Sequence, residues 1–141
     1  MIKVYFAAPM LGDRSALEIA KKIVSGLKKK GYKILTEHVV EDVLDIERGA
    51  KPREIFERDI KLLDEADLLI AEVSYPSLGV GFEIAYFLLK SKPVLAFAKE
   101  ERENRVSAMI RGITWDNFKF YTYRSVEDVL NLVDLFVNRF L

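Results

Sequence analysis

The chain has 141 residues, half of them hydrophobic and 31% charged, which is the balance of one globular domain, and we predict a single domain over residues 1–141. Lys plus Arg and Asp plus Glu number 22 each, so no net positive charge attracts nucleic acid, and we expect a small-molecule partner. With no cysteine and one histidine, thiolate chemistry and histidine-cluster metal sites are excluded, and we predict neither a metal nor a cofactor.

The N-terminal part of the sequence predicts a strand, a helix and a second strand. Residues 2–8 are rich in β-branched and aromatic side chains and are followed by Pro9. Ser15 can cap a helix whose apolar residues recur at helical spacing until Gly31 ends it. Residues 32–36 then predict the second strand, and a polar segment follows.

The middle of the chain predicts a helix, a buried strand and another helix. Pro52 suits the first turn of a helix. Residues 67–73 form the continuous apolar run that is typical of a buried parallel strand. A turn at 74–77 leads into a helix that extends to about residue 90. The predicted core face of the helix that begins at Pro52 consists of Ile55, Phe56, Ile60, Leu62 and Leu63.

The C-terminal part adds a fourth strand at 92–98, a charged loop at 99–105 and a short helix at 106–110. Pro93 lies at the first position of the strand, where a missing N–H does little harm. These elements continue the alternation of strands and helices.

A fifth strand at 118–123 and a helix opened by Ser125 and Asp128, as a variant capping box, complete the chain. The alternation predicts an α/β fold, a flavodoxin-like doubly wound five-stranded parallel sheet with helices on both faces. Ligands of such sheets bind outside the carboxyl ends of the strands. That edge would be built by residues 8–14, 36–39, 74–83 and 99–111.

The sequence contains no recognisable membrane span or secretion signal. A span needs roughly 18 or more apolar residues in a row, and the chain has no such run. Its start, MIKVYFAAPM, lacks the basic-then-apolar order of a signal peptide. We therefore expect a cytoplasmic protein that does not bind membranes.

The segment PSLGVGFEIAYFLL, residues 76–89, carries one carboxylate, Glu83, among apolar residues and glycines. A buried unpaired charge is costly, so this carboxylate needs a partner, water or a role. If Ser77 is the N-cap, Glu83 falls in the second helical turn, where the helix dipole no longer explains an acid. Glu83 then points either at a cleft or at a buried cation, and we favour a functional carboxylate.

The start of the same helix predicts a phosphate site. Ser77 can cap the helix, and Gly79 and Gly81 let a ligand approach the backbone amides. The alternative is that glycine after a strand forms only a tight turn, because neither a Walker lysine nor a full GxGxxG is present. Both interpretations stay open from the sequence.

Three further residues have ordinary structural explanations as well as functional ones. On pattern alone Asp59 is an exposed helix residue, because acids and bases alternate around it. Tyr5 alternates with Val4 and Phe6 and is by default a core residue whose hydroxyl has a nearby partner. His38 follows a strand end and can touch a ligand, although a lone histidine is more often a surface residue.

The segments YFAAPM, GDR, LTEH, FERDI, DLLIAEVSYPSLGVGFE and RVSAMIRG occur in this order. Together they resemble the 2'-deoxynucleoside 5'-monophosphate N-glycosidases, relatives of the nucleoside 2-deoxyribosyltransferases, over nearly the whole chain. RVSAMIRG separates the nucleotide hydrolases from the transferases, which typically carry Asn in the region of Ser107. Residues 8–13 differ, because they lack the internal arginine of the hydrolases and carry Pro9, which is more familiar in the transferases.

The resemblance implies hydrolysis with retention at the anomeric carbon. Glu83 matches the nucleophile, which attacks C1' and forms a covalent deoxyribosyl-enzyme. Asp59 matches the second acid, which assists the leaving base and the incoming water. Tyr5 would position the nucleophile and crowd the 2' position, so that ribonucleotides fit poorly.

The resemblance also implies a homodimer. Ser77 and the Gly79 region would hold the 5'-phosphate, and Ser107 would reach the same phosphate from the neighbouring subunit. The other residues that we predict to bind substrate are Ala8, Met10, Gly12, Asp13, His38 and Met109.

Two other functions stay open from the sequence. One is a deoxyribosyltransferase that exchanges bases between unphosphorylated deoxynucleosides. The other is a nucleotide-binding module that keeps the pocket without the chemistry, because a fold alone does not establish catalysis.

Overall fold

Five strands form one parallel sheet in a computed structural model that describes residues 1–9, 14–41 and 48–141. Their order is β2-β1-β3-β4-β5, and each neighbouring pair is parallel. This is the flavodoxin-like, doubly wound order, so the predicted fold class is confirmed. The strands are β1 (Lys3–Ala7), β2 (Lys33–Ile34), β3 (Leu68–Glu72), β4 (Val94–Lys99) and β5 (Phe118–Tyr123).

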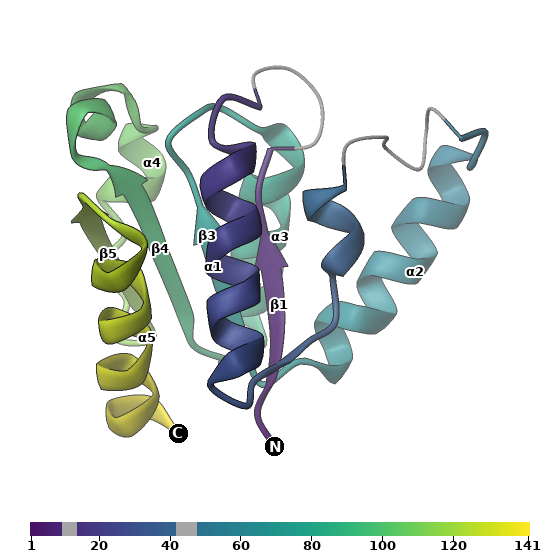
Figure 1. The fold of residues 1–141 in the computed structure, drawn as a ribbon. Coiled ribbons are helices and arrows are strands. Elements are labelled where there is room, and N and C mark those ends of the chain that lie inside the picture. Colours follow the sequence, from purple (N-terminus) through teal and green to yellow (C-terminus); the bar gives the residue numbers. More distant parts are fainter. Residues whose placement is uncertain (10–13, 42–47) are drawn as a thin grey trace.

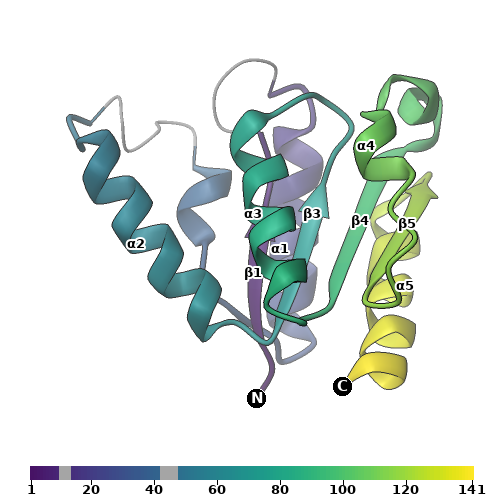
Figure 2. The same cartoon turned by 180° about the vertical axis from the view of Figure 1, so that it is seen from behind.

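Helices cover both faces of the sheet. Helices α1 (Leu17–Lys29) and α5 (Val126–Phe140) lie on the face that is in front in Figure 1. The opposite face, in front in Figure 2, carries the remaining α-helices. These are α2 (Pro52–Glu65), α3 (Leu78–Leu89) and the short α4 (Ala108–Arg111), and two 3₁₀ helices, η1 (Glu37–Val40) and η2 (Glu100–Arg105), lie in connections.

Successive residues of β1 belong to two different cores. Val4 and Phe6 are buried with residues of α1 and α5, whereas Tyr5 and Ala7 are buried with residues of α2 and α3. This follows from the alternation of side chains along a strand. The Tyr5 hydroxyl is thereby delivered to the α2 and α3 side of the sheet.

The strand order reverses between β1 and β3, which are neighbours in the sheet. Ala7 at the end of β1 pairs with Ala71 near the end of β3. The segments that follow these two strands therefore start side by side at the carboxyl edge, the upper edge in Figure 1. A ligand site is expected at such a reversal.

Several local predictions differ from the structure. Helix α1 begins at Leu17 with Ala16 at the N-cap position, so Ser15 is not the capping residue. Phe56, predicted to be core, is 55% exposed, because its ring lies 6.1 Å from that of Phe82 and not on the sheet. Residues 100–105, predicted as a loop, form η2.

The second strand is shorter than predicted, because at Thr36 the side chain, in place of the backbone, forms the hydrogen bonds to β1. The Thr36 hydroxyl accepts a hydrogen bond from the Phe6 N–H (2.8 Å) and donates one to the Phe6 carbonyl (2.7 Å). The chain can therefore leave the sheet at this point and turn into η1. The predicted caps at Ser77 and at Ser125 with Asp128 are confirmed.

Candidate active site

Glu83 lies on the second turn of α3 and faces the first strand. The Tyr5 hydroxyl, on a fully buried side chain of β1, donates a hydrogen bond to Glu83 Oε2. Val80, Ile84 and Phe87 of α3 are buried against the sheet, which fixes the helix and its carboxylate relative to β1. The carboxylate that stood out in the sequence thus meets a hydroxyl group.

The surroundings of Glu83 change its acidity. Its pKa is raised to about 7, chiefly by burial; the hydrogen bond from Tyr5 lowers the pKa and the charge of Asp59 raises it. Both the acid and its carboxylate form are therefore populated near neutral pH. Burial, followed by the charges of Glu83 and Asp59, raises the pKa of Tyr5, so this hydroxyl keeps its proton and remains a donor.

Asp59 is a half-buried residue of α2 and not the exposed residue that the charge pattern predicted. Its side chain is 16% exposed, and its Oδ1 lies 3.6 Å from His38 Nε2. Arg58 Nε donates a hydrogen bond of 3.0 Å to the same oxygen. Because its charge raises the pKa of both Glu83 and Tyr5, Asp59 belongs to the same group of side chains.

The segment that carries His38 is held by two residues that the sequence reasoning missed. Arg14 donates hydrogen bonds to the carbonyls of Val39 (2.7 Å) and Glu41 (2.9 Å), and Thr36 ties the start of η1 to β1. Their partners are distant in the sequence, and no local pattern signals these contacts.

The first turn of α3 has the geometry of an anion site. Ser77 caps the helix, and its Oγ accepts a hydrogen bond of 3.3 Å from the Val80 N–H. Among the described residues, a Cβ at Gly79 would meet only Ser77 Oγ, at 4.0 Å, and a Cβ at Gly81 would meet no atom within 4 Å. Packing within the described part of the chain therefore does not require these glycines, which leaves the approach to the helix amides open.

A pocket of about 140 Å³ adjoins this turn. Ser77 and Ser107 of the same chain both line it, together with Arg105, which the sequence reasoning did not single out. Its other lining residues are Val73, Tyr75, Pro76, Val80, Gly81, Ile84, Val106 and Ile110. The two predicted phosphate-site serines are thus close to one cavity.

The remaining predicted substrate residues are placed differently. The Ala8 side chain is buried in the core on the α1 side, so only its backbone is available to a ligand. Met109 on α4 is 83% exposed. Met10, Gly12 and Asp13 lie outside the described residues.

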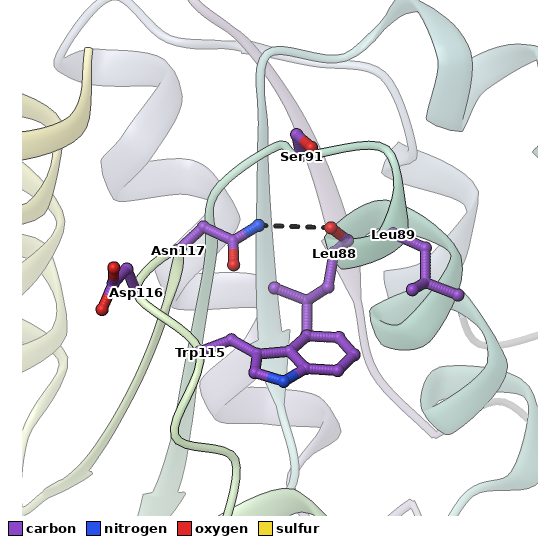
Figure 3. Close-up of a pocket in the computed structure, with 6 residues that line it drawn as sticks. All are labelled: Leu88, Leu89, Ser91, Trp115, Asp116 and Asn117. Atoms are coloured by element: carbon purple, nitrogen blue, oxygen red, sulfur yellow. Dashed lines mark hydrogen bonds between the residues drawn. The ribbon is translucent and has the colours of Figure 1, made fainter.

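A larger, open hollow of about 400 Å³ lies at the other end of α3. Figure 3 shows Trp115 from the segment before β5 beside Leu88 and Leu89 from the end of α3, with Asn117 bonded to the Leu88 carbonyl. None of the predicted site residues lines this hollow. It is therefore separate from the Glu83 group.

Two features are absent from residues 1–9, 14–41 and 48–141. That part of the chain contains no helix long and apolar enough to cross a membrane. It also contains no group of three or more His, Cys, Asp or Glu side chains that could hold a metal ion.

Comparison with known proteins identifies the family. The sequence profile described as nucleoside 2-deoxyribosyltransferase matches residues 4–131. The chain belongs to this family. Within the family, the chain is 62% identical over 133 residues to a Thermofilum pendens protein named "Putative 2'-deoxynucleoside 5'-phosphate N-hydrolase 1", covering 94% of this chain and 93% of that protein. It is 34% identical over 128 residues to human 5-hydroxymethyl-dUMP N-hydrolase, covering 88% of this chain and 73% of the human protein.

Solved structures share the fold of this nucleoside 2-deoxyribosyltransferase family member. The solution structure of BlsM has a TM-score of 0.76 at 20% identity and covers 97% of this chain and 90% of its own. The structure of the Clostridium botulinum CMP N-glycosidase BcmB has a TM-score of 0.67 at 21% identity, and the match covers 95% of this chain and 98% of BcmB. At such identities the likeness shows the fold alone.

Proposed function

We propose that this protein hydrolyses the N-glycosidic bond of 2'-deoxynucleoside 5'-monophosphates, giving a free base and 2-deoxyribose 5-phosphate. The observation that carries the proposal is the half-buried Glu83 carboxyl bonded to Tyr5 beside a second acid, Asp59. Relatives named as N-hydrolases of such nucleotides support it. A cytoplasmic location is part of the proposal and is tested by cell fractionation.

In the first step, a Glu83 oxygen attacks C1' as the bond between C1' and the base nitrogen breaks. A carboxylate next to C1' stabilises the positive charge that develops on the sugar. The leaving base takes up a proton, and Asp59 is the side chain that we propose to relay it. The product is a covalent ester between Glu83 and the deoxyribose phosphate.

In the second step, water attacks C1' and releases the Glu83 carboxylate. The Asp59 carboxylate accepts a proton from this water and passes it to solvent, which balances the proton that the base took up in the first step. Tyr5 keeps its proton throughout and orients Glu83 through their hydrogen bond. Its buried ring also restricts the space beside the sugar, which disfavours a 2'-hydroxyl.

The 5'-phosphate binds at the start of α3 in this proposal. Ser77 and the amide groups near Gly79 supply hydrogen-bond donors, and the helix dipole favours the negative charge. The open surface above Gly79 and the adjoining pocket with Ser77 and Ser107 support this placement. His38 lies beside the second acid, with its Nε2 3.6 Å from Asp59 Oδ1.

We further propose that the enzyme is a homodimer in which Ser107 completes the neighbouring site. An exposed apolar stripe on α3 supports the dimer: Leu78 is 97% exposed, Phe82 50% and Leu89 73%. With Ala85 between them, these residues recur at the spacing of one helix face. We call these four residues the α3 stripe. Exposed apolar surface of this kind marks an interaction site.

The decisive test is release of base. Purified protein is incubated with dGMP, dAMP, dCMP, dTMP, 5-hydroxymethyl-dUMP and GMP, and free base is followed by chromatography. We expect base from at least one deoxynucleotide and little from GMP. The Glu83→Ala variant should be slower by a factor of about a thousand or more, because it lacks the nucleophile. No base from any deoxynucleotide with folded protein would refute the proposal.

A second candidate is base exchange between deoxynucleosides, favoured by the family profile that matches residues 4–131. Formation of deoxyadenosine from deoxyinosine and adenine, with no dependence on a 5'-phosphate, would select this transferase. Tight binding of a deoxynucleotide without release of base over hours would instead indicate a binding module.

A further inference from the structure

A buried carboxylate, Glu72, lies outside the group formed by Tyr5, Asp59 and Glu83. It ends strand β3 and has no exposed surface. Ala71 before it faces the α2 and α3 side, so alternation directs Glu72 to the opposite face of the sheet from Glu83. The proposed reaction does not use this carboxylate, and its burial requires another explanation.

Both oxygens of Glu72 accept hydrogen bonds. Oε1 accepts from the Ser74 N–H at 2.6 Å, and Oε2 accepts from the Ser74 hydroxyl at 3.0 Å and from the Tyr123 hydroxyl. Burial raises the pKa of Glu72, and these hydrogen bonds lower it. The carboxylate thus links the end of β3 to the end of β5 and to the segment that follows β3.

Ser74 is held at each of its polar groups. Besides its two bonds to Glu72, its hydroxyl accepts from the Lys99 N–H at 2.8 Å, and its carbonyl accepts from Arg102 Nε at 3.1 Å. The Arg102 guanidinium also lies 4.3 Å from the centre of the Tyr75 ring. The start of the loop at 74–77 is therefore fixed to β4, β5 and η2 at once.

We propose that Glu72 is a positioning residue for phosphate recognition, which it serves by fixing Ser74 and hence the loop that places Ser77 at the start of α3. This inference rests on the proposed function. The chemistry at Glu83 should depend on Glu72 much less. The body of α3 is held independently, through the buried side chains Val80, Ile84, Phe87 and Leu88.

The test compares a nucleotide with its unphosphorylated nucleoside. In Tyr123→Phe and Glu72→Gln we expect KM for dGMP to rise about tenfold while kcat stays within about threefold. The values for deoxyguanosine should not change, because it has no phosphate to bind. Tyr32→Phe is the matched control, since it removes a tyrosine–carboxylate bond of 3.0 Å to Asp134 on the same side of the sheet.

A loss of equal size for dGMP and deoxyguanosine would overturn the inference, because a merely structural role weakens both. An unchanged KM for dGMP in Tyr123→Phe would overturn it as well. This variant keeps its aromatic ring in the core, so it remains a test if Glu72→Gln does not fold.

Calorimetric binding of dGMP and deoxyguanosine in a Glu83→Ala background separates this inference from the proposed reaction. A wild-type protein that releases no base refutes the hydrolysis. The two binding constants then still decide the role of Glu72.

Discussion

At the scale of single residues, Glu83 is tuned in opposite directions by its two neighbours. Because the proposed nucleophile must be ionised, kcat/KM should fall as the pH drops through the Glu83 pKa of about 7. The Tyr5 hydrogen bond lowers this pKa, so Tyr5→Phe should move the acid limb of the pH profile to higher pH. The Asp59 charge raises it, so Asp59→Asn should move the limb to lower pH.

The quantity to compare is the pH at which the acid limb of the profile lies, and not the rate itself, because Tyr5→Phe and Asp59→Asn both lower the rate. We expect displacements of about one pH unit in kcat/KM profiles on the best deoxynucleotide. Tyr86→Phe is the control, since the Tyr86 hydroxyl bonds Asp64 and not Glu83. If the acid limb moved in the same direction in Tyr5→Phe and Asp59→Asn, its assignment to Glu83 would be contradicted.

The sequence could flag Glu83 by physics alone, because a carboxylate in an apolar helix is anomalous wherever it lies. The same argument applies to Glu72 in an apolar strand, but the sequence reasoning did not use it there. Asp59 carries no such anomaly among its charged neighbours. Its role depends on His38 and Glu83, which only the fold brings near. The fold likewise brings Tyr5 to Glu83, which is 78 positions away in the sequence.

At the scale of elements, α2 is anchored mainly at its C-terminal end. Leu63 is its only buried residue, whereas Lys92 Nζ donates to the carbonyls of Leu63 (3.3 Å), Asp64 (2.9 Å) and Ala66 (2.9 Å). A cation at these carbonyls satisfies groups that the helix leaves unpaired. We expect Lys92→Met to lower the free energy of unfolding by about 1–3 kcal/mol.

Urea unfolding measures this loss, and hydrogen exchange of the α2 amides localises it. Lys90→Met is the matched control, because Lys90 is exposed and should change stability by less than about 0.5 kcal/mol. Equal losses in the two variants would show that the carbonyl contacts do not anchor α2. Since α2 carries Asp59, Lys92→Met should also slow base release.

The light packing of α2 explains why the sequence overestimated its core face. Helical spacing identifies which residues share a face but not what covers that face. Phe56 repeats at the right spacing, yet it pairs with Phe82 on the surface. The strands were easier to predict, because a run such as that of β3 is buried on both sides in a parallel sheet.

At the scale of the whole molecule, the strand order follows from the alternation of elements, but the face that remains exposed does not. α3 is apolar nearly all round in sequence, a pattern that is typical of a helix buried on every side. In the structure one side of it, the α3 stripe, is exposed, with Leu78 at 97% and Leu89 at 73%. A second copy of the chain is the occupant that we propose for it.

Substitution in the α3 stripe should therefore dissociate the dimer. Leu89→Glu places a charge in the proposed interface, and we expect dimerisation to weaken by about tenfold or more. Leu135→Glu is the control, because Leu135 is 67% exposed on α5, on the opposite face. Analytical ultracentrifugation over a range of concentrations measures both. A wild-type monomer, or equal effects of the two substitutions, would contradict the interface.

Mixing two damaged chains then tests whether Ser107 acts across that interface. If Ser107 acts in its neighbour's site, a heterodimer of Glu83→Ala and Ser107→Ala chains has one site with both defects and one site with neither, because a twofold dimer exchanges the same residues in both directions. Random mixing makes half of the dimers heterodimers, so about a quarter of wild-type activity should return. This is well above the mean of the two variants. If Ser107 serves the pocket that it lines in its own chain beside Ser77, the mixture should show only the mean of the two variants. Adding Leu89→Glu to both chains, which should dissociate the dimer, should abolish the recovery.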